Sequence, residues 1–181
     1  MSELFSIQLQ NRQQQGRDGV WLDLPTTTEQ VQAALRQIGI SSDNPQGLFI
    51  SGYFAEEEKR FAIPYNMVLA SNVDELNFLA SRLETLSTGE RAELNAALQA
   101  PQSELFSIGR ITDFPENVDY YVHLPDVHGP AQLGDYYLNR SGMVDMPEEW
   151  KGGIDTAQFG RYVAQQEQGV FTEYGYLVKS G

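Results

Sequence analysis

The spacing of apolar residues changes along the chain, and this change constrains the fold more than any other feature. Near the N-terminus apolar residues occur in short strand-like runs, at residues 4–9, 20–24 and 47–54. From residue 72 to residue 100 they recur three or four positions apart, which is the spacing of one helix face. Strand-like runs return after Pro101. Segregated strand and helix patterns of this kind predict an α+β fold.

The middle of the chain predicts a helical hairpin. Its first helix carries a stripe of leucines, at Leu76, Leu79, Leu83 and Leu86. Ser87 and Glu90 match a capping box, in which each side chain satisfies a free backbone amide at the start of a helix. We expect the second helix to begin there and to end before Pro101, because the residue before a proline disfavours helical backbone.

A further helix is predicted in the N-terminal part of the chain, directly after the first two strand-like runs. Residues 26–29 match a capping box with Thr26 as the N-cap. Gly39 has the residue type that favours the end of a helix. The two strand-like runs before this helix are most simply explained as a hairpin.

The C-terminal part predicts two helices followed by a strand. Pro130 suits the first position of a helix, and Gly142 suits the position just after its end. Asp155 is the expected N-cap of the next helix. Residues 170–178 are rich in aromatic and β-branched side chains and predict a final strand, interrupted by Gly175.

A six-residue sequence occurs twice in the chain. Residues 2–7 and 103–108 are identical, and in each case a second strand-like run that ends in Leu-Pro follows. This repetition favours two related α+β modules on either side of a helical one. The predicted boundaries are residues 1–60, 61–102 and 103–181. A chance repeat of strand-favouring residues is the alternative.

The chain is strongly acidic. It has 25 Asp and Glu residues against 12 Lys and Arg residues, which gives a net charge of −13. Such a charge repels phosphate backbones and anionic lipids, so we expect neither direct nucleic-acid binding nor membrane binding. The sequence shows no apolar run of signal-peptide or membrane-span length, which predicts a cytoplasmic protein.

The sequence contains no recognisable catalytic or cofactor site. It has no Cys, which excludes thiolate metal sites and a cysteine nucleophile, and the motifs of phosphate loops, dinucleotide sites, serine hydrolases and zinc proteases are missing. His123, Asp126 and His128 could in principle supply three metal ligands on one loop. The nearby Pro125 and Pro130 fit an ordinary turn better. We therefore predict a protein that is not an enzyme and that holds no cofactor or metal.

The acidic residues become denser toward the C-terminus. The net charge is −2 over residues 1–55, −4 over 56–110 and −7 over 111–181. Between residues 112 and 149 a single base, Arg140, accompanies eight acids: Asp113, Glu116, Asp119, Asp126, Asp135, Asp145, Glu148 and Glu149. A surface made acidic for solubility alone is one explanation. The more specific explanation is that carboxylates on a folded scaffold bind a partner protein whose own binding site is positively charged.

Several segments together resemble the ArdA antirestriction proteins, small acidic proteins of conjugative plasmids and transposons. Residues 133–147 look like the antirestriction motif of that family. The segments that carry the likeness are residues 19–25, 71–80, 133–147, 154–161, 169–171 and 174–176. They follow one another in the same order as in the family and span most of residues 19–178.

The resemblance implies an elongated protein of three modules that forms a homodimer and imitates bent B-form DNA. Such a protein would occupy the DNA-binding groove of type I restriction-modification enzymes, chiefly their methyltransferase core, and protect incoming mobile DNA. A dimer would carry twice −13, or −26, which is the formal charge of about 13 base pairs of DNA. The shape of the protein and the placement of its carboxylates must therefore also contribute to the affinity for the enzyme. The acids expected to face the enzyme are the eight named above together with Asp74 and Glu75.

Two alternatives stay open at this point. The motif residues could form the seam of the dimer or the core of their own module; they are Leu133, Gly134, Tyr136, Tyr137, Gly142 and Met143. The acidic surface could also belong to an interaction module of a mobile element that docks another basic partner or regulates conjugation.

Overall fold

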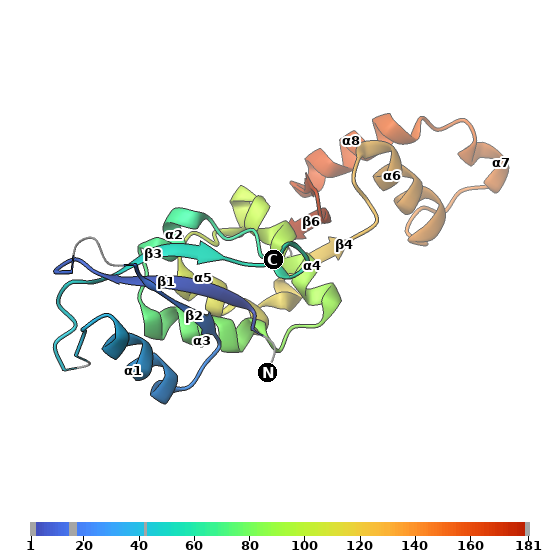
Figure 1. The fold of residues 1–181 in the computed structure, drawn as a ribbon. Coiled ribbons are helices and arrows are strands. Elements are labelled where there is room, and N and C mark those ends of the chain that lie inside the picture. The colour runs from blue at the N-terminus through green and yellow to red at the C-terminus, as the bar shows by residue number, and fades with distance from the viewer. Residues whose placement is uncertain (1–2, 15–17, 42, 180–181) are drawn as a thin grey trace. The chain divides into compact units, whose positions relative to one another are not determined.

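The computed structural model of the chain describes residues 3–14, 18–41 and 43–179 (Figure 1). Its residues group into two compact units. The N-terminal unit consists of Met1–Leu86 with Leu105–Pro115, and the C-terminal unit consists of Ser87–Glu104 with Glu116–Gly181. Each unit combines helices with a three-stranded antiparallel sheet, which confirms the α+β class. The division into three modules stays a prediction.

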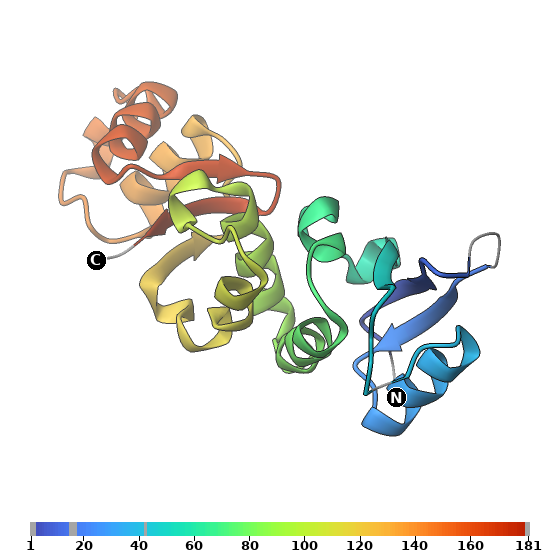
Figure 2. The ribbon, with the colours of Figure 1, turned by 90° about the vertical axis from the view of Figure 1, so that its left-hand side faces the viewer.

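The N-terminal unit is built on a sheet in which β1 (Phe5–Asn11) lies between β2 (Val20–Leu24) and β3 (Leu48–Phe54). The first two strands, blue in Figures 1 and 2, pair antiparallel, which confirms the predicted hairpin. Of the loop that joins them, residues 15–17 lie outside the described residues. Ile7 and Leu9 are completely buried, so one face of the central strand forms the core of this unit.

Helices complete the core of the N-terminal unit. They are α1 (Thr28–Gln37), α2 (Tyr65–Leu69), α3 (Val73–Leu83) and α5 (Ile108–Thr112), with short 3-10 turns η1 (Glu57–Lys59) and η3 (Phe114–Glu116). The predicted stripe of α3 is buried as expected: Leu76, Leu79 and Leu83 are 0% exposed. This helix packs against β2 and α5.

The start of α1 differs from the prediction by one residue. Thr27, not Thr26, is the N-cap, and its side chain accepts a hydrogen bond from the backbone amide of Gln30 at 3.3 Å. Thr26 is held outside the helix because its backbone pairs with the side-chain amide of Asn77 on α3. At the other end of α1, Gly39 has a φ of +74°, which confirms its predicted place after the last helical turn.

The C-terminal unit contains a second small sheet and four α-helices. The strands are β4 (Tyr121–Leu124), β5 (Val170–Thr172) and β6 (Gly175–Lys179), in the order β4-β6-β5. The helices are α4 (Thr88–Gln99), α6 (Pro130–Asp135), α7 (Glu148–Lys151) and α8 (Thr156–Glu167). The shorter turns are η2 (Pro101–Ser103), η4 (Val118–Tyr120) and the π-helical turn η5 (Tyr136–Arg140).

Three of the predicted boundaries in this unit are confirmed. Ser87 and Glu90 form the capping box of α4, and Asp155 caps α8. Pro130 occupies the first turn of α6. The predicted final strand is instead two antiparallel strands, β5 and β6, because Gly175 has a φ of +118° and begins β6 after a tight turn.

The repeated hexapeptide adopts two different structures. In the first copy, residues 5–7 lie in β1, and Ser2 lies outside the described residues. In the second copy, Ser103 ends a 3-10 turn and Ser107 is the N-cap of α5, so no strand forms. The structure therefore favours a chance repeat over duplicated modules. Among the described residues, no helix combines the length and the apolar character that a bilayer span requires.

Candidate functional site

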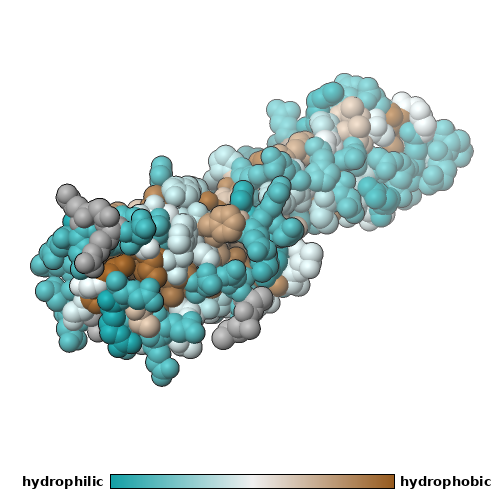
Figure 3. All heavy atoms as spheres, viewed as in Figure 1, coloured by the Kyte–Doolittle hydropathy of each residue, from teal (hydrophilic) through white to brown (hydrophobic). Residues whose placement is uncertain are grey.

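All ten acids predicted to face a partner are exposed. In the N-terminal unit, Asp74 and Glu75 lie in the first turn of α3 and Asp113 follows α5. The C-terminal unit carries the other seven: Glu116, Asp119, Asp126, Asp135, Asp145, Glu148 and Glu149. On the face drawn in Figure 3, hydrophilic side chains cover most of the part that contains α6, α7 and α8.

The two units differ in their balance of charge. The N-terminal unit has 12 acids and 7 bases, a net charge of −5, whereas the C-terminal unit has 13 acids and 5 bases, a net charge of −8. The C-terminal unit is therefore the more negative of the two, as the distribution along the sequence predicts. Its field favours a positively charged partner surface.

Some of these acids have partners close by on the same helix or turn. Asp135 accepts a hydrogen bond from Asn139 at 2.8 Å and lies 3.9 Å from the guanidinium of Arg140. Glu148 pairs with Lys151 at 2.9 Å. Such exposed pairs contribute little to stability and exchange readily with water, so these carboxylates can still meet a partner.

Asp126 and Asp135 are brought together, although they are nine positions apart in the sequence. Both line a shallow hollow of about 490 Å³ with Arg140, and the other lining residues are Ala131 and Gln132. In contrast, Asp145 and Glu149 make neither an ion pair nor a side-chain hydrogen bond within the described part of the chain.

The motif segment of residues 133–143 forms the helix α6 and the π-helical turn η5, which pack on α8. Leu133 is 0% exposed and belongs to the core cluster of this unit. Tyr136 and Tyr137 are half-buried against the same cluster, ring edge to ring face. Gly134 is also buried. These residues therefore contribute to the module core, which is one of the two alternatives left open by the sequence.

A shared carboxylate joins the motif segment to the end of the chain. Glu167 on α8 accepts hydrogen bonds from the hydroxyls of Tyr137 and, at 2.6 Å, of Tyr176. Burial, followed by these bonds to Glu167, raises the pKa of both tyrosines well above the usual range. Both phenols therefore stay protonated and act as donors at neutral pH. Nothing in the sequence points to this contact, because Tyr137 lies 30 residues before Glu167 and Tyr176 lies 9 residues after it.

The segment that follows the motif is exposed and apolar as well as acidic. Gly142, with a φ of +73°, ends the helical turn, and Met143 is 74% exposed. Trp150 on α7 is 64% exposed and lies beside Glu148 and Glu149. Sequence reasoning did not single out Trp150, although a Trp next to two acids between Pro147 and Gly152 is a recognisable signal for an exposed anchor.

The two histidines have structural partners. His123 contacts the carbonyl oxygen of Tyr174 through Nε2 at 2.7 Å, and His128 contacts that of Thr172 through Nδ1 at 3.4 Å. His123 thereby ties β4, and His128 the loop after it, to the segment around the β5–β6 turn. Within residues 3–14, 18–41 and 43–179, no group of three or more His, Asp and Glu side chains is arranged to hold a metal ion.

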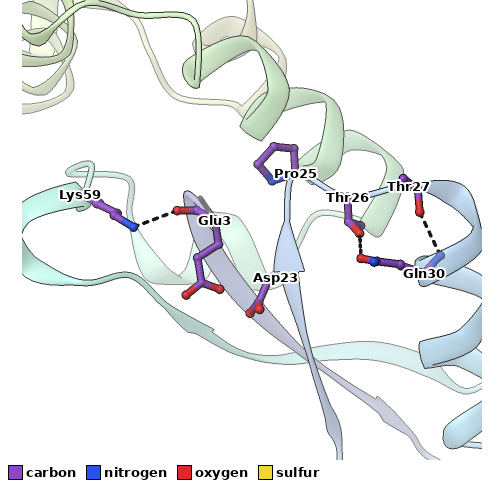
Figure 4. Close-up of a pocket in the computed structure, with 7 residues that line it drawn as sticks. All are labelled: Glu3, Asp23, Pro25, Thr26, Thr27, Gln30 and Lys59. Atoms are coloured by element: carbon purple, nitrogen blue, oxygen red, sulfur yellow. Dashed lines mark hydrogen bonds between the residues drawn. The ribbon is translucent and has the colours of Figure 1, made fainter. Parts of the chain in front are cut away.

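A polar hollow of about 440 Å³ lies in the N-terminal unit, at the start of α1 (Figure 4). Glu3 and Asp23 bring two carboxyl groups together there, and hydrogen bonding to Asp23 raises the pKa of Glu3. Lys59 donates to the backbone oxygen of Glu3 at 3.3 Å. The other lining residues are Pro25, Thr26, Thr27 and Gln30. The hydroxyl of Ser6 donates a hydrogen bond to Asp23 at 2.6 Å, so part of the acceptor capacity of this carboxyl pair is used within the sheet.

Comparison with protein-family models places this chain in a family. A family model described as "Antirestriction protein (ArdA)" matches residues 15–178, which is nearly the whole chain. Antirestriction proteins are inhibitors, not enzymes. No curated protein matches the chain.

Proposed function

Because this chain belongs to the ArdA family of antirestriction proteins, we propose that it inhibits type I restriction-modification enzymes by imitating B-form DNA. The observation that supports this mechanism best is that all ten predicted acids are exposed and that seven of them lie in helices or helical turns. Fixed carboxylates can replace phosphates in a positively charged groove, whereas a disordered acidic tail would first have to be ordered.

The proposed partner is the methyltransferase core of the enzyme, because this core contains the groove that binds the DNA recognition sequence. Occupation of this groove would exclude DNA and would protect incoming mobile DNA in the cytoplasm. The charge of two chains matches about 13 base pairs, so carboxylate placement must supply part of the specificity. An elongated arrangement of three modules would suit a DNA-like footprint.

We propose further that the active form is a homodimer joined near the motif segment. Leu133 and Gly134 are buried within their own unit, so they would hold the motif segment in place without contacting the second chain. Gly142 and Met143 are exposed and would form the contact itself. Because Met143 is a large apolar side chain that is 74% exposed, contact with a second chain would remove it from water.

The proposed inhibition is tested with a purified type I restriction-modification enzyme and unmodified DNA. We expect added protein to reduce cleavage at least ten-fold. The triple variant Asp145→Asn, Glu148→Gln, Glu149→Gln should inhibit less, because it removes three exposed charges next to the motif segment. The matched control removes three exposed charges from η1 and its N-cap, through Glu56→Gln, Glu57→Gln and Glu58→Gln. Full cleavage in the presence of the unaltered protein would contradict the proposal.

A second candidate function is supported by a specific observation. Met143 and Trp150 are strongly exposed apolar side chains within an acidic segment. The phosphate backbone of DNA carries no apolar groups at its surface that these side chains could imitate. These two side chains favour an interaction module that docks a basic partner with an apolar pocket or that regulates conjugation. If this module were the whole function, Trp150→Ala would abolish partner binding and the acidic triple variant would leave it unchanged.

A further inference from the structure

A small aromatic cavity lies in the N-terminal unit. It has a volume of about 330 Å³ and is formed where β3 ends and the chain leads into α2. Seven residues line it: Tyr53, Phe54, Ala55, Arg60, Phe61, Ile63 and Tyr65. The volume falls in the range of small-molecule sites, about 300–1,000 Å³.

The cavity has a buried base and an exposed aromatic rim. Phe61 and Ile63 are 3% and 7% exposed and form part of the core. Phe54 and Tyr65, in contrast, are 56% and 51% exposed. Large aromatic rings left in water beside a hollow are typical of a surface that contacts a ligand.

Tyr53 supplies an unused hydrogen-bond donor at this cavity. Its ring stacks on Phe5 at 5.4 Å and lies 6.3 Å from the ring of Tyr65, so its position is fixed by packing. Its hydroxyl is buried and has no hydrogen-bond partner among the residues that the structure describes. Burial raises the pKa of Tyr53 to about 12, so the hydroxyl stays protonated at neutral pH. A buried hydroxyl without a partner is unfavourable unless something supplies an acceptor.

Arg60 supplies a positive charge at the same cavity. One guanidinium nitrogen donates to the backbone oxygen of Ala55 at 3.1 Å, which holds the side chain in place. A guanidinium has five N–H donors in a planar fork that matches a carboxylate. In a unit with a net charge of −5, this placed arginine gives the cavity a local preference for an anion.

From these contacts we infer that the cavity lined by Tyr53, Arg60 and Tyr65 binds a small carboxylate with a flat aromatic body. The ring of the ligand would stack between exposed aromatic side chains, and its carboxylate would accept hydrogen bonds from Arg60 and Tyr53. Among the described residues that line the cavity, none is acidic. The site is independent of the acidic surface and would act whether or not the protein imitates DNA.

Fluorine NMR with 4-fluorophenylacetate as the probe tests this inference. We expect the probe signal to broaden or shift saturably on addition of the protein. The neutral analogue 4-fluorophenylacetamide and the ringless fluoroacetate should each bind about ten-fold more weakly, since each lacks one of the two recognised groups.

Variants then assign the binding to this cavity. Arg60→Gln should raise the dissociation constant about ten-fold, and Tyr53→Phe should raise it several-fold, since both remove donors to the carboxylate. Arg161→Gln is the matched control, because it removes one exposed positive charge from α8 and should leave the constant within about two-fold. Circular dichroism establishes that each variant is folded.

Three results would overturn the inference: no saturable binding of the probe, equal affinity for the acid and the amide, or equal losses in Arg60→Gln and Arg161→Gln. If Arg60→Gln fails to fold, Tyr53→Phe decides alone, since it removes only a single unpartnered oxygen. Unchanged binding by that folded variant would then contradict the assigned site.

Discussion

Gly160 of α8 lies so close to α6 that a Cβ atom built on it would stand 2.9 Å from the backbone nitrogen of Gly134. The same atom would stand 1.7 Å from the carbonyl oxygen of Pro130. Gly134 is equally confined, since its own Cβ would lie 1.9 Å from the carbonyl oxygen of Thr156. The two helices therefore meet backbone to backbone, and a glycine on each is what permits the contact.

Replacement of Gly160 by Ala should destabilise the C-terminal unit by more than about 2 kcal/mol, because the added methyl group meets backbone atoms that cannot move independently. Urea unfolding measures this change. Gly152→Ala is the control: nothing lies within 4 Å of its Cβ position, and its φ of −64° suits alanine. Equal free energies of unfolding for the two variants would disprove the close helix contact.

Glu167→Gln should cost about 1–3 kcal/mol of stability, because a side-chain amide has one acceptor oxygen for two tyrosine hydroxyls, and one hydroxyl loses its bond. Thermal or urea unfolding reports the loss. The exposed Glu173, whose carboxylate has no hydrogen-bond partner within the described residues, provides the control variant Glu173→Gln. A Glu167→Gln protein as stable as this control would show that the tyrosines do not depend on the carboxylate.

Glu93 should make the stability of the protein depend on pH. Burial, with smaller effects of Glu90 and Asp119, raises its pKa from 4.5 to about 7. The folded state therefore binds this proton more tightly than the unfolded state, so the stabilisation is present below pH 4.5 and is lost as the pH rises toward 7. Glu93→Gln should consequently gain stability relative to the unaltered protein at pH 8 and gain little at pH 4.5.

Urea unfolding at the two pH values tests the role of Glu93, again with Glu173→Gln as the control for removal of one negative charge. A stability difference between Glu93→Gln and the unaltered protein that is the same at both pH values would show that Glu93 titrates normally.

Met143→Glu should convert a dimer to a monomer, because it places a charge in the proposed seam at a position that is 74% exposed within one chain. Tyr137→Glu is a poorer test, since Tyr137 is half-buried and bonded to Glu167, so the variant would also disturb folding. Sedimentation velocity measures the oligomeric state. The seam is placed elsewhere if folded Met143→Glu still sediments as a dimer.

Local signals in the sequence predicted the elements whose ends are decided locally. The capping box of Ser87 and Glu90, the cap at Asp155 and the glycine at Gly39 each act within one helical turn, so no distant residue is needed to interpret them. The hairpin of β1 and β2 was predicted for the same reason.

The features that the sequence missed depend on tertiary contacts. Three consecutive threonines can each cap α1, and the choice of Thr27 follows from two hydrogen bonds between Thr26 and the distant Asn77. The first copy of the repeated hexapeptide contributes to strand β1, whereas the second copy leads into helix α5. The segments that pack around each copy decide which structure it adopts.

For the candidate site, the sequence predicted which acids are charged and exposed, since isolated Asp and Glu are seldom buried. It could not predict that Leu133 and Gly134 are enclosed by α8, because the close approach depends on Gly160, which lies 26 residues away from Gly134. Trp150 was missed because its exposure depends on how α7 is placed in the unit.

The central claim, that the protein occupies a DNA-binding groove as a charge mimic, is tested most directly by binding to a type I methyltransferase core in the presence of competing duplex DNA. The measurement is made at about 50 mM and about 200 mM salt, a range over which phosphate-mediated binding weakens strongly. The account predicts that protein and DNA exclude each other and that the affinity of the protein falls at least about ten-fold at the higher salt. Simultaneous binding of both, or an affinity that salt does not change, would contradict it.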